Sequence, residues 1–292
     1  MHAVTITEGR LEWRRHPDPH PARGELLVEV RAAGVNGADM LQRRGLYPAP
    51  AGSAADIPGL ELAGEVIETG PEVERFSAGD RVMAVVGGGA QAELAVVHER
   101  VALAVPAGVP WDAAGGFPEV FTTAHDALFT QCGLALGERA LVHGAAGGVG
   151  IAGVQLAARA GARVTATVRN AALRADVATI GARTGSVVVV APDEFGAEAP
   201  FDVVLELVGA PNLSGDLDAL AIGGRIAVIG VGSGATTELN LLTLMGKRAR
   251  LHGSTLRARP LEQKADAARA VEAHVLPLLA AGDVEVPVAA TY

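Results

Sequence analysis

The spacing of hydrophobic positions along the chain changes near residue 118. Before that point, short segments of alternating apolar and polar residues are separated by glycine and proline, a pattern that predicts β-strands. The expected strands are residues 2–7, 25–33, 61–69, 80–86 and 92–97. Strands at irregular spacing indicate a partly closed β domain, and the long segment 34–58 between two of them is a candidate site loop.

Beyond residue 118, strand patterns alternate with helical ones. The expected strands are 139–143, 163–168, 186–190, 202–207, 225–230 and 249–253, and the expected helices are 120–129, 149–160, 171–180 and 212–220. This alternation predicts a parallel sheet covered by helices on both faces, so we expect an α/β fold. A further helix is expected from Leu261 to Leu278, with Gly282 as its C-cap.

The composition narrows the class of protein. The chain has 292 residues, a length typical of about two domains. A formal net charge of -9 gives no electrostatic reason to bind nucleic acid or an anionic membrane. The single cysteine, Cys132, excludes disulfide frameworks and multi-cysteine zinc sites, and we expect it to be a small buried hydrophobic residue. No targeting segment is recognisable, so we expect a cytoplasmic protein without membrane segments.

The uncharged segment 140–158 contains the strongest candidate for ligand binding. Three of its glycines, Gly144, Gly147 and Gly150, are spaced three residues apart between an expected strand and an expected helix. In that context, glycines form a tight turn and leave backbone N–H groups uncovered for a pyrophosphate at the helix N-terminus. Ala145 replaces the first glycine of a strict GxGxxG pattern, so a plain glycine turn is the alternative interpretation.

The end of the next expected strand indicates which cofactor binds. NAD sites usually have an acidic residue about 20 positions after the glycines, which accepts the ribose hydroxyls. This chain has Arg169 and Asn170 there, and no carboxylate. An arginine can pair with a 2′-phosphate, so NADPH is favoured, with Arg174 as a second candidate contact. The alternative is that Arg169 is an ordinary solvated surface residue.

Several motifs together resemble those of the medium-chain dehydrogenase/reductase superfamily, over essentially the whole chain. They are Gly34-Val-Asn-Gly-Ala-Asp39, Arg44-Gly-Leu-Tyr-Pro48, Pro58-Gly-Leu-Glu-Leu-Ala-Gly64, Gly79-Asp-Arg-Val82, Ala145-Ala-Gly-Gly-Val-Gly150 and Gly253-Ser-Thr-Leu-Arg257. Segments 42–48, 118–122 and 253–259 look like the zinc-free quinone oxidoreductases, in particular the branch named for a tumour-suppressor-induced quinone oxidoreductase. The resemblance implies a GroES-like β domain (residues 1–117 and 283–292), a Rossmann domain with a doubly wound parallel sheet (residues 118–282), and a homodimer.

The resemblance also implies roles for individual residues. The substrate and nicotinamide cleft would hold the three expected catalytic residues, Asn36, Asp39 and Tyr47. The expected cofactor-binding residues are Thr122 near the nicotinamide carboxamide, Gly147, Gly148 and Val149 at the pyrophosphate, Arg169 at the adenosine ribose, Gly209, Gly230, Val231 and Gly232 at strand ends, and Leu256 and Arg257 beside the nicotinamide half. For Tyr47, packing of a turn tyrosine against Pro48 is the alternative.

The chain departs from the zinc-dependent members of that superfamily. Val35 and Leu60 stand where those relatives carry a cysteine and a histidine, and a four-cysteine lobe is absent. A catalytic zinc needs about three protein ligands, so we expect no metal. Two regions are shorter than the resemblance implies. They are the passage 181–202, where we expect a helix to be missing, and the segment after Tyr292, where relatives continue with a helix and a strand.

Three functions are compatible with these residues. The first is a metal-free, NADPH-dependent quinone reductase, in which the protein mainly positions the nicotinamide against the acceptor. Tyr47 would hydrogen-bond an acceptor oxygen or deliver a proton, and Asn36 and Asp39 would orient the substrate or the nicotinamide ribose. The second is a reductase of enoyl groups or other alkenes conjugated to a carbonyl. The third is a cofactor-binding protein without useful turnover, such as a sensor.

Overall fold

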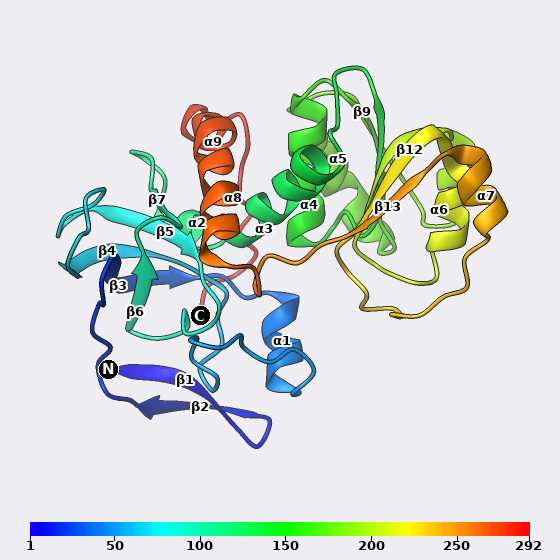
Figure 1. Ribbon diagram of the computed structural model, residues 1–292. Helices are drawn as coiled ribbons and strands as arrows, with labels where there is room; N and C mark the ends of the chain where they lie inside the picture. Colours follow the sequence, from blue (N-terminus) through cyan, green and yellow to red (C-terminus); the bar gives the residue numbers. More distant parts are fainter. The chain divides into compact units, whose positions relative to one another are not determined.

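One of the two structural units is discontinuous in sequence. The computed structural model describes residues 1–292 (Figure 1). Its internal contacts divide the chain into a β unit, Met1–Thr122 with Leu256–Tyr292, and an α/β unit, Thr123–Thr255. Residues 118–122 and 256–282 make their contacts in the β unit, whereas the sequence-based boundaries assign them to the Rossmann domain.

The β unit is built on a five-stranded antiparallel sheet. Its strands are β3 (Glu25–Ala33), β4 (Glu61–Thr69), β5 (Arg81–Val85), β6 (Leu94–His98) and β7 (Ala102–Ala104), in the order β6-β3-β4-β5-β7. Side chains alternate between the two faces of a strand, and Leu26, Val28 and Leu62 are among those buried in a common core. A separate antiparallel hairpin pairs β1 (His2–Thr7) with β2 (Arg10–Arg15).

Five helices accompany the sheet of the β unit. They are α1 (Gly37–Arg43), α2 (Trp111–Gly115), α3 (Pro118–His125, which crosses the boundary between the units), α8 (Leu261–His274) and α9 (Leu276–Ala281). Of these, only α1 connects two strands of the sheet. Leu261, at the start of α8, packs against the core of the sheet. The expected C-cap is confirmed, because α9 ends at Gly282 with the left-handed φ of 73°.

The α/β unit contains a six-stranded parallel sheet. Its strands are β8 (Arg139–Val142), β9 (Arg163–Thr167), β10 (Val187–Val190), β11 (Phe201–Glu206), β12 (Leu220–Val228) and β13 (Arg250–Gly253), in the order β10-β9-β8-β11-β12-β13. Its helices are α4 (Gly148–Arg159), α5 (Arg174–Ala182), α6 (Leu213–Ala219) and α7 (Leu241–Lys247). This is the strand order of a Rossmann fold, and such sheets bind ligands where the order reverses, here between β8 and β11.

Alternation along the central strands explains why both faces of this sheet are covered. Ala140 and Val142 on β8 belong to the core that also contains Val154 of α4 and Val177 of α5. Leu141, between them, belongs to the opposite core, which includes side chains of α6 and α7. The sheet therefore lies between two layers of helices, and the expected α/β class is confirmed.

The structure departs from the predicted elements in several places. The hydrophobic pattern does not predict β2, which has only two apolar residues, Leu11 and Trp13, or β7, which has only three residues. The expected helix 120–129 ends as α3 at His125 and continues as a π-helix, Asp126–Gln131. Between β10 and β11 there is only a 3₁₀ turn, Phe195–Glu198, so the missing helix is confirmed. None of the helices has the length and hydrophobicity that crossing a bilayer requires.

Candidate functional site

The glycine-rich turn joins β8 to α4 at the point where the strand order reverses. β8 ends at Val142, Gly144 has a left-handed φ of 64°, and α4 begins at Gly148 with Gly147 as its N-cap. The first N–H groups of a helix have no partner within the helix and lie at the positive end of its dipole. The turn therefore offers hydrogen-bond donors to an anion.

Gly150 and Gly147 in this turn differ in the space that is available for a side chain. A Cβ atom on Gly150 would lie 2.5 Å from the carbonyl oxygen of Gly144 and 2.6 Å from Cα of Ala145, so the fold itself excludes a side chain there. A Cβ atom on Gly147 would meet only the carbonyl oxygen of Gly144, at 3.5 Å, which is an ordinary contact. The protein therefore does not require glycine at Gly147, but a side chain there would cover the start of α4. The turn fits the pyrophosphate of a dinucleotide.

The strand next to this turn ends at the positions expected to select the cofactor. After β9 comes the buried Val168, followed by Arg169 and Asn170, which are exposed. Arg174 is directed at the backbone, because its Nε donates a hydrogen bond to the carbonyl oxygen of Val168 at 3.0 Å. An exposed arginine at a strand end that carries no acidic residue suits a phosphate group better than a pair of ribose hydroxyls.

The loops that follow β11 and β12 are bonded to each other. Ser233 N–H donates to the carbonyl oxygen of Val208, and Ala210 N–H donates to that of Gly234, both at 2.9 Å. A Cβ atom on Gly209 would lie only 2.6 Å from the carbonyl oxygen of Gly234, so this approach of the two loops needs a glycine. The structure thus brings together four residues that the sequence analysis assigns to the cofactor: Gly209, Gly230, Val231 and Gly232.

A buried carboxyl group holds the loop after β11. Glu206, the last residue of β11, is fully buried, and its Oε1 accepts the N–H groups of Val208 and, at 2.7 Å, of Gly209. Its Oε2 accepts a hydrogen bond from Nδ2 of Asn212 at 3.0 Å. Burial raises the pKa of Glu206, whereas the neighbouring His143 and the two N–H groups lower it. Glu206 therefore positions the backbone that carries Gly209.

His143 connects this carboxyl group to the rest of the α/β unit. Its Nδ1 lies 2.9 Å from Oγ1 of Thr167, and its Nε2 lies 2.7 Å from Oδ1 of Asp216 on α6 and 4.0 Å from Oε2 of Glu206. His143, Glu206 and Asp216 form the only group of three or more potential metal ligands, and all three are buried. The 2.7 Å contact is the length of a direct hydrogen bond, so we interpret the group as a hydrogen-bonded network.

In the β unit, Asn36 and Asp39 lie at the start of α1, beside a second buried carboxyl group. Asp39 accepts the N–H of Asn36 at 2.8 Å and the N–H of Gly59 at 2.9 Å. Asn36 donates from Nδ2 to Oε1 of Glu61 at 2.8 Å. The other oxygen of Glu61 accepts the N–H of Glu119, in the first turn of α3, at 2.8 Å. Asp39 thus holds the backbone of the loop, and Glu61 holds the side chain of Asn36.

Both of these carboxyl groups have a raised pKa. For Glu61, burial raises the pKa to about 8, although the hydrogen bonds from Glu119 N–H and Asn36 lower it. The nearby carboxylates of Glu119 and Asp39 raise it further. Burial likewise raises the pKa of Asp39, against the hydrogen bonds that it accepts. Carboxyl groups with perturbed pKa values are frequent in active sites, which marks this cluster as a candidate.

Arg257 stabilises the candidate site loop through hydrogen bonds. Its guanidinium is buried and donates hydrogen bonds to the carbonyl oxygens of Gly87, at 2.8 Å, and Tyr47, at 2.9 Å, and to the side-chain oxygen of Gln42. Its Cζ lies 4.9 Å from the centre of the Tyr47 ring, a cation–π contact. The resemblance implies that Arg257 lies beside the cofactor, and in the structure its contacts fix both the backbone and the ring of Tyr47.

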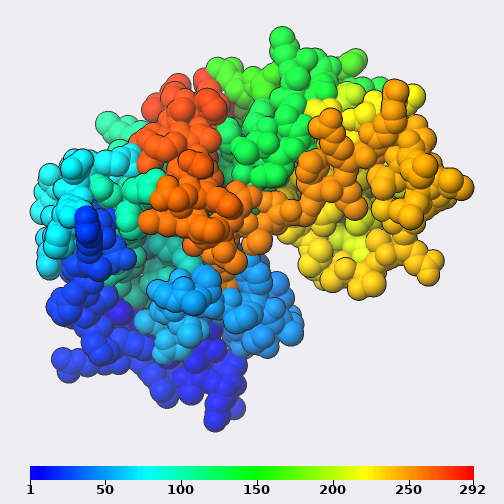
Figure 2. Space-filling view, viewed as in Figure 1, coloured from blue at the N-terminus to red at the C-terminus, as the bar shows by residue number.

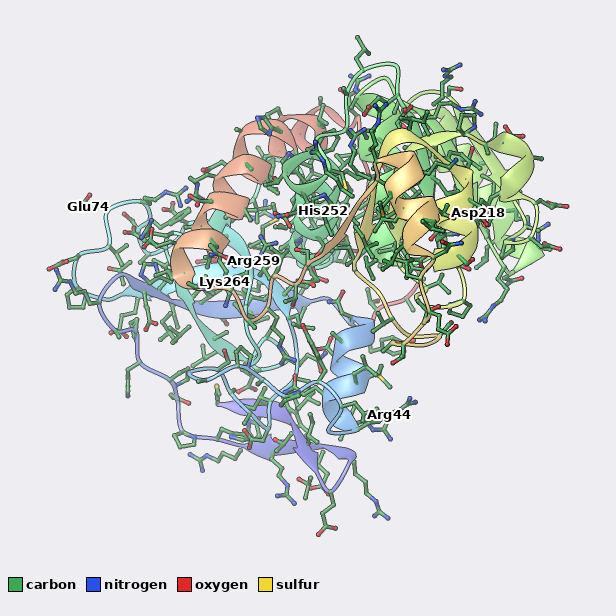
Figure 3. The ribbon with its side chains drawn as sticks, turned by 45° about the vertical axis from the view of Figure 1, so that its right-hand side comes forward. Arg44, Glu74, Asp218, His252, Arg259 and Lys264 are labelled. Atoms are coloured by element: carbon green, nitrogen blue, oxygen red, sulfur yellow. The ribbon has the colours of Figure 1, made fainter.

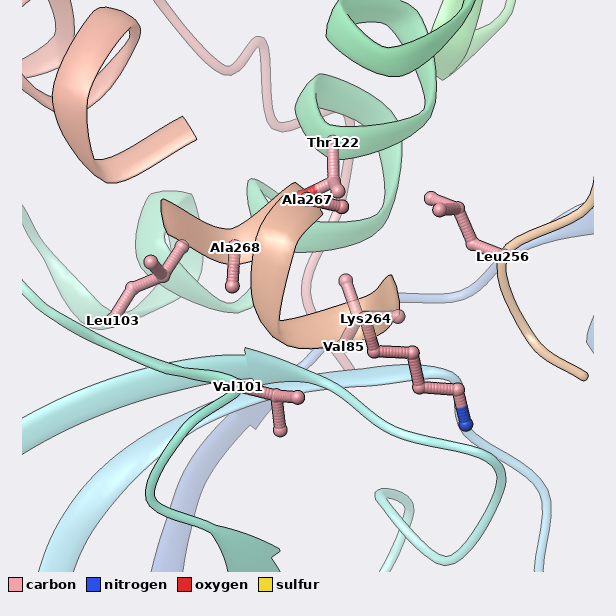
Figure 4. Close-up of a pocket in the computed structure, with 8 residues that line it drawn as sticks. All are labelled: Val85, Val101, Leu103, Thr122, Leu256, Lys264, Ala267 and Ala268. Carbon is pink, nitrogen blue, oxygen red and sulfur yellow. The ribbon is translucent and has the colours of Figure 1, made fainter. Parts of the chain in front are cut away.

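Thr122 and Leu256 meet at a small pocket of the β unit. The other lining residues are Val85, Val101, Leu103, Lys264, Ala267 and Ala268 (Figure 4). Of these, Lys264 lies in α8 (Figure 3). The pocket volume is about 20 Å³, which is room for one or two water molecules and too small for a quinone ring. Thr122 and Leu256, which the resemblance assigns to the same half of the cofactor, are thus neighbours.

Three residues in these arrangements are absent from the sequence-based candidates: Glu61, Gln42 and Glu206. Glu61 is the only charged residue of the motif 58–64, and a lone charge in an apolar segment is a signal that could have indicated it. Glu206 likewise follows the apolar run from Val203 to Leu205. Gln42 carries no such signal, because its role depends on where Arg257 lies.

Comparisons with known proteins agree with both architectures. Residues 22–129 match the family described as Alcohol dehydrogenase GroES-like domain, and residues 148–273 match the family described as Zinc-binding dehydrogenase. Quinone oxidoreductase from Homo sapiens is 32% identical over 263 residues, which are 87% of this chain and 78% of that protein. The chain therefore belongs to the medium-chain dehydrogenase/reductase superfamily. The predicted GroES-like and Rossmann-type architectures are confirmed.

Two further relatives differ in how much of their own length this chain matches. Erythronolide synthase EryA2 from Saccharopolyspora erythraea is 47% identical over 144 residues, which are 49% of this chain and only 4% of that protein. The solved quinone oxidoreductase from Thermus thermophilus, described with its NADPH complex, superposes with a TM-score of 0.82 at 30% identity. That match covers 98% of this chain and 89% of the other. The chain is thus similar both to separate quinone oxidoreductases and to a small part of a polyketide synthase.

Proposed function

We propose that the protein is a metal-free quinone reductase that uses NADPH. The observation that carries this proposal is the turn before α4, where glycine at Gly147 is not required by the fold and leaves the helix N-terminus uncovered. The similarity to quinone oxidoreductases over 87% of the chain supports the class of acceptor.

The cofactor part of the proposal rests on the α/β unit. Gly147, Gly148 and Val149 would bind the pyrophosphate through their N–H groups, and Arg169 would pair with the 2′-phosphate. The loops at Gly209 and at residues 230–232 would line the remaining part of the dinucleotide. Bound NADPH supplies the hydride that, together with one proton, converts a quinone to a hydroquinone.

The acceptor part of the proposal rests on the β unit. Tyr47 would donate a hydrogen bond to an acceptor oxygen or deliver the proton, and Arg257 keeps its ring in a fixed orientation. Asn36 would orient the acceptor or the nicotinamide ribose through its amide. Asp39 would act indirectly, because both of its oxygens already accept backbone N–H groups. Thr122 and Leu256 would contact the nicotinamide half.

The proposal that no zinc takes part rests on the available donor atoms. Val35 and Leu60 have aliphatic side chains that cannot coordinate a metal, and a catalytic zinc needs about three protein ligands. The buried group around His143 already forms direct hydrogen bonds. Activity is expected to survive prolonged incubation with a chelator, and metal analysis is expected to find no stoichiometric zinc.

A second candidate function is the reduction of an enoyl group. It is favoured by the 47% identity to a segment of Erythronolide synthase EryA2, a higher identity than that to the human quinone oxidoreductase but over fewer residues. Hydride addition to a conjugated C=C bond also needs a proton at the neighbouring carbon, and Tyr47 is the candidate donor.

We also propose a homodimer formed through β13. β13 pairs only with β12, so its other edge is open. On the adjacent α7, Leu241, Leu242 and Met245 are 63%, 78% and 70% exposed, and the yellow-orange atoms of this segment lie at the surface (Figure 2). A second copy paired at this edge would cover both the strand and the apolar side chains. The solution mass of the wild type and of Leu242→Glu tests this proposal.

Steady-state oxidation of NADPH separates the candidate functions. A panel of quinones is measured beside a panel of enals, enones and enoyl thioesters at equal concentrations. Higher kcat/KM values for quinones support the first candidate, and higher values for enoyl substrates support the second. Tight binding of NADPH with turnover on neither panel would overturn both and leave a cofactor-binding protein without catalysis.

A further inference from the structure

Glu61 occupies a central place among the candidate residues of the β unit. It is the first residue of β4 and is only 2% exposed. One carboxyl oxygen accepts the amide of Asn36, and the other accepts the N–H of Glu119 in α3. One carboxyl group therefore bonds the site loop on one side and the helix that carries Thr122 on the other.

The backbone of the site loop is shaped around this carboxyl group. A Cβ atom on Gly34 would lie 2.1 Å from Oε1 and 2.6 Å from Cδ of Glu61. Gly34 does not have a positive φ, so the reason for glycine is the close approach and not a left-handed turn. Any side chain at Gly34 would displace Glu61 and, with it, the amide of Asn36.

Ionising the buried carboxyl group of Glu61, so that both oxygens act as acceptors, is energetically unfavourable. Burial raises the pKa of Glu61 to about 8, and the facing carboxylates of Glu119 and Asp39 add to the effect. Glu99 provides a comparison within the same unit, because it is 9% exposed and its Oε2 accepts the N–H groups of Glu74 and Arg75. Glu99 bonds only to a loop outside the candidate site, whereas Glu61 bonds to two segments that both contribute candidate residues.

We propose that Glu61 is a positioning residue. By bonding both the amide of Asn36 and the first turn of α3, it fixes their relative positions, so that Asn36 and Thr122 are correctly placed for the reaction. This inference rests on the proposed function, and it assigns to the same site a residue that does not itself touch the acceptor. While Glu61 is ionised, each oxygen accepts one donor. When Glu61 is protonated, one of its oxygens becomes a hydroxyl group, which donates a hydrogen bond. The side chain of Asn36 can accept that bond only if its amide group turns so that Oδ1, instead of Nδ2, faces Glu61.

The kinetic test compares Glu61→Gln with the control Glu99→Gln at about pH 9, where Glu61 is mostly ionised. Glu61→Gln replaces one buried acceptor by a donor and is expected to lower the melting temperature, whereas Glu99→Gln keeps one oxygen that can accept both N–H groups. Only Glu61→Gln is expected to lower kcat/KM for the acceptor, by about tenfold, the effect of losing one hydrogen bond to a charged group. The Kd for NADPH is expected to change by less than about twofold, because the pyrophosphate and 2′-phosphate contacts lie in the other unit. Equal kinetic losses in the two variants would overturn the proposal.

A second kinetic test asks whether Glu61 acts through Asn36. In an Asn36→Ala background the amide is already gone, so adding Glu61→Gln is expected to lower kcat/KM by no more than about threefold, the part due to α3. If the losses of kcat/KM caused by the two single substitutions multiply in the double variant, Glu61 acts independently of Asn36 and the proposal is wrong.

A measurement without turnover keeps this proposal separate from the proposed function. In ¹H–¹⁵N spectra, the side-chain amide of Asn36 is expected to shift with pH in a single step near the pKa of Glu61, about 8. The step is expected to disappear in Glu61→Gln and to move to lower pH in Glu119→Gln, which removes a facing carboxylate but keeps the backbone N–H. An amide resonance that does not titrate in the wild type would overturn the proposal, whether or not Glu61→Gln folds. If neither substrate panel is reduced while the amide titrates as expected, the proposed function fails and the positioning contact stands.

Discussion

Glu61 in the β unit and Glu206 in the α/β unit are both buried glutamates that bond to loops of the candidate site, but their surroundings differ. Glu206 accepts three hydrogen bonds and has the His143 ring 4.0 Å away. Glu61 accepts two hydrogen bonds and faces two further carboxylates. Burial raises the pKa of both groups. Around Glu206, His143 and the N–H groups of Gly209 and Val208 lower the pKa, against one facing carboxylate, Asp216, so the negative charge is partly compensated. Around Glu61, the carboxylates of Glu119 and Asp39 raise the pKa further, so the negative charge is opposed.

The substitution with the largest expected effect breaks the compensated arrangement. Glu206→Ala leaves two backbone N–H groups and the amide of Asn212 without their acceptor, and it leaves His143 beside an empty space. We expect the free energy of unfolding to fall by about 3–5 kcal/mol, because three buried donors are left without an acceptor. Urea denaturation measures this loss. The exposed Glu238→Ala is the control, with an expected change within about 0.5 kcal/mol. A similar loss in both variants would contradict the role of Glu206.

A pH series tests the opposed arrangement at Glu61. Its pKa is raised from 4.5 to about 8, so between these values the folded protein keeps a proton that the unfolded chain releases. The contribution to stability is therefore present at low pH and is lost as the pH rises through 8. We expect the free energy of unfolding of the wild type to fall relative to Glu61→Gln by about 3 kcal/mol between about pH 5.5 and 8. Parallel curves for the two proteins would show that Glu61 has an ordinary pKa.

A pair of alanine substitutions extends the comparison from side chains to the backbone. Gly150→Ala brings a Cβ atom within 2.5 Å of a carbonyl oxygen, and we expect it to cost about 1–3 kcal/mol of stability. Gly147→Ala has room and is expected to leave the melting temperature nearly unchanged, while its methyl group weakens NADPH binding. Thermal denaturation and NADPH titration of both variants test this division. Unchanged NADPH affinity in Gly147→Ala would argue against a pyrophosphate at this turn.

The smallest expected effect concerns the exposed arginine at the end of β9. Arg169→Ala removes a charge that we assign to the 2′-phosphate, so the KM for NADPH should rise about tenfold while that for NADH changes less than about twofold. Arg163→Ala is a matched control, because Arg163 is also exposed but lies at the opposite end of the same strand. Equal changes for the two cofactors would exclude Arg169 as the selective residue.

The sequence predicted most of the architecture because its strongest patterns are local. The segment of β4 and the glycine turn before α4 can each be recognised from about ten consecutive residues. β2 was missed because only two apolar residues, Leu11 and Trp13, alternate along it, and both are exposed. The helical periodicity of α8 does not reveal which sheet the helix packs against, so the sequence pattern alone could not assign residues 256–282 to one unit or the other.

The candidate site was less predictable than the fold. Asn36, Asp39 and Tyr47 came from motifs, but the residues that hold them, Glu61 and Arg257, act through contacts across 25 and 210 positions of sequence. Such contacts depend on the assembled β unit and leave no periodic signal. Their roles as positioning residues could be inferred only once distances and burial were known.

The discontinuity of the β unit has a consequence for how the protein is made. α8 closes this unit, since Glu262 bonds to the guanidinium of Arg100 at 2.6 Å and Arg269 donates to the carbonyl oxygen of Arg100 at 2.7 Å. During synthesis, Met1–Thr122 leaves the ribosome well before Leu256–Tyr292, whereas the α/β unit is contiguous and can complete its own contacts in between. The unit that is translated first is therefore the unit that is finished last.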